Sequence, residues 1–120
     1  MPCRAIRGAI TADKNTPAAI DAATKELLHA MVAANKIKSK DIASAIFTVS
    51  KDLTAAFPAT SARVIGWDDV PMLCALEIPV PKSLKKCIRV MLLVNTWRSQ
   101  KKINHQYLKG AMRLRPDIAG

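Results

Sequence analysis

The sequence predicts an α+β (mixed α/β) fold, in which about five strands form a mixed sheet on one long helix and one or two short helices. Two observations support this class. Apolar segments of strand length recur along the chain, and one long amphipathic segment follows the first of them. No repeat, low-complexity tract or clear linker interrupts the 120 residues, so we expect a single domain over residues 1–120.

The first two elements are a strand and the long helix. Small and β-branched side chains alternate over Arg4–Thr11, which is typical of a strand. Thr16 is a suitable N-cap residue, and Pro17 suits the first position of a helix. Apolar residues then repeat at helical spacing as far as about Asn35, so the helix is expected to end there.

Three further strands follow. They are Ile42–Val49, which is apolar apart from Ser44 and Thr48, then Met72–Ile78 and Cys87–Asn95, the most apolar segment of all. Helices are expected on one face of the sheet. The second and fourth strands look apolar on the other face too, so partner subunits are expected to cover it.

The remaining elements are predicted from local composition alone. Leu53–Ile65 is alanine-rich and favours short helical turns, although Pro58 interrupts it. We expect a short helix at Ile103–Leu108 and a last extended piece at Ala111–Leu114.

The composition excludes several classes of protein. The 19 Lys and Arg exceed the 9 Asp and Glu by 10, so the chain should attract nucleic acid, a membrane surface or a small anion. Only 4% of the residues are aromatic, which disfavours a base-stacking module. No run approaches the roughly 20 apolar residues that cross a bilayer, and no signal peptide is expected.

No motif indicates a bound metal or nucleotide. Cys3, Cys74 and Cys87 lack the spacing of a zinc site or a disulfide framework, so a reducing cytoplasm is expected. A Walker loop, a dinucleotide fingerprint and a nucleophile elbow are also missing from the sequence. An enzyme of this sequence is therefore expected to use no metal and no cofactor.

The informative feature is charge inside apolar strands. Arg89, Arg7 and Glu77 each lie in a predicted strand, where an unpaired ion costs several kcal/mol. They are either a structural ion pair or an anion site, because two arginines and one glutamate leave a positive charge for a carboxylate ligand. The sequence leaves both open. His29 and His105 have no acid or nucleophile at a telling spacing and are expected to be structural or surface residues.

At these positions the chain resembles the small mixed α/β chorismate mutases, the trimeric class typified in Bacillus, and not the all-helical class. The resemblance covers nearly the whole chain in order. Its pieces are Arg4–Ala9, Phe57–Ala59, Arg63, Gly66-Trp67, Val70-Pro71, Cys74, Glu77, Leu84–Met91, Tyr107-Leu108 and Leu114–Asp117.

The resemblance implies an isomerase that rearranges chorismate to prephenate on the route to phenylalanine and tyrosine in the shikimate pathway. It also implies a barrel-like homotrimer with each active site between two subunits, a cytoplasmic location, and no nucleic acid or membrane partner. Chorismate would be the small-molecule partner.

The resemblance assigns roles at the centre of the site. Arg89 would lie beside the ether oxygen of the breaking bond and contact a carboxylate. Arg7 would bind a carboxylate with help from Tyr107. Glu77 would accept a hydrogen bond from the ring hydroxyl, with Cys74 against the same hydroxyl.

It assigns further roles at the edge of the site. Arg63 would favour the second carboxylate near the mouth, and Leu114 and Arg115 would close over the pocket. Phe57 and Ala59 would form a wall contributed by the neighbouring subunit.

The sequence departs from the family at the rim. Thr60 stands where the family often has lysine, and Leu73, a substrate-binding position, stands where threonine is common. One residue is missing between Arg63 and Gly66. Residues 115–120 are expected to form a mobile tail. Two alternatives remain: a basic module that binds nucleic acid or another polyanion, and a catalytically silent trimer of the same fold.

Overall fold

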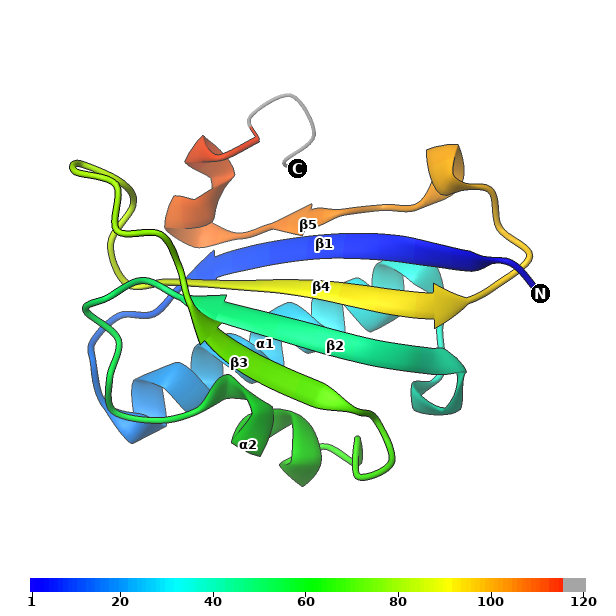
Figure 1. Cartoon of the computed structure of the whole chain (residues 1–120), viewed down its shortest axis with the longest axis horizontal. Coiled ribbons are helices and arrows are strands. Elements are labelled where there is room, and N and C mark those ends of the chain that lie inside the picture. The colour runs from blue at the N-terminus through cyan, green and yellow to red at the C-terminus, as the bar shows by residue number, and fades with distance from the viewer. Residues whose placement is uncertain (116–120) are drawn as a thin grey trace.

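The computed structural model describes residues 1–115 as a five-stranded mixed sheet with both helices on one face (Figure 1). The strand order is β3-β2-β4-β1-β5. The β4 strand pairs antiparallel with β1 and β2, whereas the β2–β3 and β1–β5 pairs are parallel. The elements are β1 Cys3–Thr11, α1 Pro17–Asn35, β2 Ile42–Val49, α2 Pro58–Val64, β3 Met72–Leu76, β4 Cys87–Asn95 and β5 Gln106–Tyr107.

The long helix begins and ends as its sequence predicts. The Thr16 side chain accepts a hydrogen bond from the Ala19 N–H at 3.1 Å, and Pro17 occupies the first turn. Lys36 ends the helix in the left-handed conformation, with φ of 51°. Two predicted strands, the central strand Cys87–Asn95 and its neighbour Ile42–Val49, are confirmed to the residue.

The main core lies between the sheet and the two helices. Alternate residues of the central strands face α1, which contributes its own apolar stripe. At Gly8 the backbone of β1 lies close to α1, because a Cβ built there would overlap the Met31 sulfur. The largest fully buried apolar side chains are Phe47, Ile6, Ile10, Ile20, Leu27, Leu28, Met31, Ile88, Leu92, Val94 and Pro58.

The prediction for the C-terminal segment was wrong in detail. Residues 103–108 contain β5 instead of a helix, and the segment predicted to be extended belongs to a 3-10 helix at Lys109–Arg113. A further 3-10 helix, Gln100–Lys102, precedes β5. The physical reason is tertiary: Gly8 and Ala9 in β1 supply a parallel pairing edge that local composition does not reveal.

The C-terminal segment covers part of the sheet face that the helices leave open. A second, smaller cluster forms there from Ala9, Cys87, Tyr107 and Ala111, with Leu84 and Leu114 packed against it. Apolar side chains elsewhere on this face stay exposed, among them Ile46, Leu73 and Met91. The predicted mobile tail falls mainly on residues 116–120, which lie outside the described residues.

Candidate active site

Arg89 projects from β4 onto the open face of the sheet. Its neighbours Ile88 and Val90 point to the main core, so the strand alternation directs the guanidinium away from the helices. The side chain is 39% exposed, which makes it half-buried in the single chain. The cation is therefore neither sealed in the core nor fully solvated.

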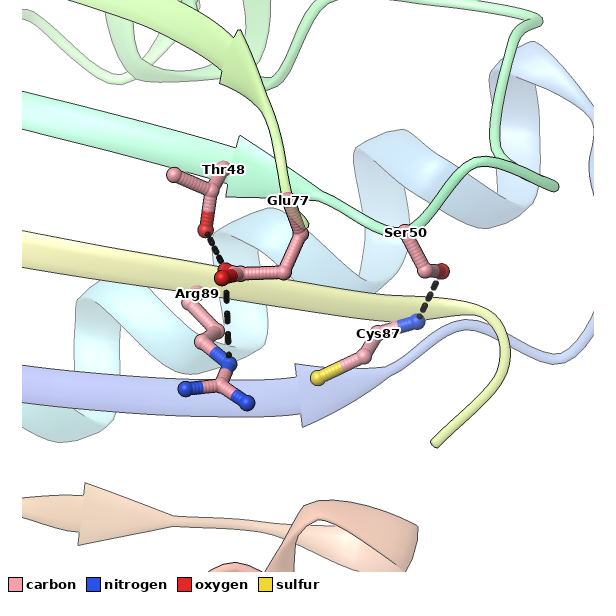
Figure 2. Close-up of polar contacts among 5 residues, drawn as sticks. All are labelled: Thr48, Ser50, Glu77, Cys87 and Arg89. Carbon is pink, nitrogen blue, oxygen red and sulfur yellow. Dashed lines mark hydrogen bonds and ion pairs between the residues drawn. The ribbon is translucent and has the colours of Figure 1, made fainter. Parts of the chain in front are cut away.

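Glu77 is the ionic partner of Arg89. Its Oε2 lies 3.5 Å from Arg89 Nε and accepts a 2.7 Å hydrogen bond from Thr48 Oγ1 (Figure 2). Thr48 lies directly opposite Arg89 in the β2–β4 register, and Glu77 follows directly after β3, the strand on the other side of β2. The two terminal nitrogens of Arg89 point away from the carboxylate in Figure 2. Glu77 thus binds one edge of the guanidinium.

A cavity of about 350 Å³ lies beside Arg89 on the open face. Arg7 reaches it from β1, where the register places Arg7 opposite Met91 and Ala9 opposite Arg89. Two cations therefore border one cavity, and its volume falls within the ordinary range for small-ligand sites. The lining consists of Arg7, Gly8, Ile46, Thr48, Arg89, Val90, Met91 and Tyr107.

The C-terminal segment forms one side of this region. Tyr107 is only 3% exposed and belongs to the small cluster on the open face, against which Leu114 also packs. The positive charge of Arg115 reaches His105, because it contributes to the lowered pKa of that imidazole after burial and Arg7.

A polar clamp fixes the start of β4. Ser50 Oγ accepts a hydrogen bond from Cys87 N at 2.9 Å (Figure 2) and donates one to Asp52 at 2.6 Å. Asp52 also accepts the Lys86 N–H at 2.9 Å. Burial alone would raise the pKa of Asp52, but these hydrogen bonds lower it overall. The clamp holds the strand register two residues before Arg89.

Cys87 lies close to Arg89 but stays a neutral thiol. Burial raises the pKa of the Cys87 thiol, and the nearby Arg89 charge lowers it only in part. Its side chain belongs to the small cluster on the open face. Cys87 is therefore a packing residue.

The other predicted site residues lie on β3, the strand at the opposite edge of the sheet from β5, and on or beside α2. Phe57 and Arg63 are exposed at the two ends of α2, and Leu73 is exposed on the edge strand β3. Ala59 is buried in the main core, and Cys74 packs against that core on the helix-covered face. None of these residues lines the cavity beside Arg89 within the described chain.

Sequence reasoning overlooked two residues that contact the predicted site residues. Thr48 was noted only as a polar residue in an apolar strand, and that polarity was the signal that it binds Glu77. His105 was expected to be structural or a surface residue, yet its Nδ1 accepts the Arg7 backbone N–H at 2.9 Å. No spacing rule connects His105 to Arg7, because the two residues are 98 positions apart.

The fold and the site define a class of protein: a small α+β domain in which two arginines, Arg7 and Arg89, border one cavity. Over residues 1–115, no group of three or more His, Cys, Asp or Glu side chains is placed to hold a metal ion. In the same residues, no helix is both long and apolar enough to cross a membrane. The chemistry that this class can perform is the positioning and electrostatic stabilisation of an anionic substrate.

Comparison with known proteins gives the family. The model of the chorismate mutase type I family matches residues 3–118. The chain is 54% identical to chorismate mutase AroH of Thermus thermophilus over 116 residues, covering 96% of this chain and 95% of the relative. It is 41% identical to chorismate mutase AroH of Bacillus subtilis (strain 168) over 120 residues, covering 99% and 94% of the two chains.

A solved structure supports the same assignment. The fold matches a chorismate mutase from Clostridium thermocellum with a TM-score of 0.90 and 52% sequence identity, over 91% of this chain and 97% of that chain. The chain belongs to the chorismate mutase type I family, whose members are isomerases that convert chorismate to prephenate for aromatic amino acid biosynthesis. The alternatives of a polyanion-binding module and a catalytically silent trimer are not supported.

Proposed function

We propose that this chain rearranges chorismate to prephenate in the cavity beside Arg89, with Arg89 as the central catalytic group. One observation carries the proposal. Glu77 Oε2 lies 3.5 Å from Arg89 Nε, while the same guanidinium borders a cavity that it shares with Arg7. A cation held along one edge and facing an anion-sized cavity suits a substrate with two carboxylates.

The reaction needs little from the protein in covalent chemistry. One carbon–oxygen bond of chorismate breaks while one carbon–carbon bond forms in the same molecule, and no atom is gained or lost. Two tasks remain for the side chains. The enolpyruvyl arm must be held over the ring, and the ether oxygen that gains negative charge must meet a fixed cation.

The residues divide these tasks. Arg7, assisted by Tyr107, binds a substrate carboxylate and holds the compact conformer. Arg89 stabilises the ether oxygen, and Glu77 accepts a hydrogen bond from the ring hydroxyl. The Thr48 hydrogen bond supports this role, because it orients the Glu77 carboxylate before substrate arrives.

We further propose that the working enzyme is a homotrimer with composite sites. Phe57 and Arg63 lie on α2, across the sheet from the strand that carries Arg7. A second copy that presents its α2 edge to this open face would add both side chains to the site. Exposed Ile46, Leu73 and Met91 provide apolar surface for that contact.

The remaining proposals concern the rim, the closing segment and the compartment. Leu114 and Arg115 would close over the bound substrate. Thr60 and Leu73 replace side chains of other character, so substrate capture at the rim should rely more on Arg63. The chain is proposed to work in the cytoplasm, where its free thiols remain reduced.

The direct test is turnover of chorismate by the purified protein. The loss of chorismate and the appearance of prephenate should occur together, in equal amounts and without added metal or cofactor. Conversion no faster than in buffer would reject the proposed function. Light scattering on the same sample should give the mass of three chains, and a stable monomer with full activity would reject the composite site.

A further inference from the structure

Along the outer edge of β1, the backbone groups form hydrogen bonds with side chains as well as with a strand. The β5 strand pairs only with Gly8 and Ala9. Further along the edge, the Gln100 amide accepts the Ala5 N–H at 3.1 Å and donates to the Ala5 carbonyl at 2.8 Å. Between these two, the Arg7 N–H finds its acceptor in His105 Nδ1 at 2.9 Å. An imidazole therefore takes the place of a strand carbonyl at the residue that borders the cavity.

We propose that His105 is a positioning residue for Arg7, holding the Arg7 backbone through Nδ1 so that its guanidinium borders the cavity. This inference rests on the proposed carboxylate-binding role of Arg7. An imidazole that accepts at Nδ1 carries its hydrogen on Nε2, so one tautomer of the neutral ring performs the task. A protonated ring has no acceptor left, and the Arg7 N–H would lose its partner.

The surroundings of His105 keep the ring neutral. Burial, followed by the charges of Arg7 on β1 and Arg115 after the last 3-10 helix, lowers the pKa of His105 below its ordinary value of 6.5. The long helix meets this segment through the uncharged amide of Asn35. At pH 7 the ring is therefore an acceptor. Acidification through the lowered pKa removes the hydrogen bond and adds a third cation beside two arginines.

Two substitutions distinguish the loss of the hydrogen-bond acceptor from the loss of the imidazole ring. His105→Asn keeps an acceptor oxygen near the Nδ1 position and cannot become a cation, whereas His105→Leu has no acceptor. Loss of one such hydrogen bond should raise KM for chorismate about 2- to 10-fold in His105→Leu, with a smaller change in kcat. His105→Asn should restore a KM close to that of the wild type.

Gln100→Leu is the matched control. It removes the neighbouring pair of hydrogen bonds on the same strand edge, two residues from Arg7, and should leave KM within about 2-fold of the wild type. If Gln100→Leu raised KM as much as His105→Leu, the effect would reflect only the stability of the β1 edge, and the proposal would be overturned. A wild-type KM in His105→Leu would overturn it as well.

The pH profile is the second readout. In the wild type, KM should rise as pH falls through the lowered pKa of His105, and this rise should be missing from the His105→Asn profile. Superimposable profiles would contradict the proposal, even if His105→Leu failed to fold.

Imidazole ¹⁵N chemical shifts in the wild type at pH 7 provide a readout independent of turnover. They should report an unprotonated Nδ1 and a protonated Nε2 for His105, and the reverse tautomer would overturn the assignment. A wild type that fails to convert chorismate, but shows the expected tautomer, would reject the proposed function and leave the hydrogen bond established.

Discussion

Glu77 orients the Arg89 guanidinium but does not fully pair its positive charge. Its Nε lies 3.5 Å from Glu77 Oε2, longer than the roughly 2.7–2.9 Å of a strong charge-assisted hydrogen bond. The 2.7 Å hydrogen bond from Thr48 to the same oxygen is the shorter contact, so Thr48 fixes Glu77 more firmly than Arg89 does. This arrangement orients the carboxylate and leaves most of the guanidinium for an anion.

Thr48→Val should test that orientation. Valine matches the shape of threonine but lacks the hydroxyl, so Glu77 loses its hydrogen bond and gains rotational freedom. We expect kcat/KM for chorismate to fall about 3- to 10-fold, as for loss of a hydrogen bond to a charged group. Thr48→Ser keeps the hydroxyl and should retain most activity. Equal rates in the valine variant and the wild type would show that Glu77 needs no such support.

For single residues, the sequence reveals an unusual position, such as a charge in an apolar strand, better than it reveals which residue contacts it. Arg89, Arg7 and Glu77 were found because a charge in an apolar strand demands an explanation in any fold. The ion pair of Arg89 with Glu77 and the anion-sized cavity are both present, so the two alternatives left open by the sequence are compatible. The role of His105 depends on a neighbour 98 positions away, which no local pattern encodes.

Among the elements, the C-terminal segment depends most on tertiary contacts. Asn35, at the end of α1 and 3% exposed, ties this segment to the helix. Its side chain donates to the Asn104 carbonyl at 2.8 Å and accepts the Asn104 N–H at 2.8 Å. This amide is thus one of the contacts that hold the stretch carrying His105 and Tyr107.

Asn35→Ala should loosen this fastening. The N–H and carbonyl of Asn104 would lose their half-buried hydrogen bonds, so we expect the free energy of unfolding to fall by about 1–3 kcal/mol, measured by chemical denaturation. Asn104→Ala removes only an exposed 3.1 Å contact to the Ala34 carbonyl, and should cost clearly less. If both variants were equally stable, the buried amide would not be the anchor.

The same contrast explains which elements were predictable. The α1 helix has strong periodicity and a clear N-cap, and strands β2 and β4 are apolar runs of strand length; the predicted bounds of all three were confirmed. The β5 strand has only two residues, Gln106 and Tyr107, which are too few for any periodicity. Its existence depends on the edge of β1, so composition alone favoured a helix there.

At the scale of the whole molecule, the predicted site residues fall into two groups. Arg7, Arg89 and Tyr107 line one cavity on the open face, whereas Arg63 on α2 and Phe57 at its N-cap lie on the helix-covered side, near β3. A single described chain does not bring the groups together. A site built from two copies would do so, and the sequence alone could predict this only through resemblance to the trimeric family.

Subunit complementation tests the composite site. Arg89→Ala and Arg63→Ala should each lower activity strongly when assembled alone. Mixed trimers made by joint refolding contain some interfaces at which both arginines are intact, so activity should reappear on mixing. Mixtures no more active than the average of the two variants would show that one chain supplies both residues.

The central claim is that the Arg89 guanidinium stabilises the transition state, and the kcat of Arg89→Ala tests it most directly. The variant should fold and assemble like the wild type, as judged by circular dichroism and light scattering. Its kcat for chorismate should fall by at least on the order of 100- to 1,000-fold. Arg89→Lys should stay severely impaired, because one ammonium cannot contact the ether oxygen and a carboxylate together. Near-normal turnover by a folded Arg89→Ala enzyme would contradict the account.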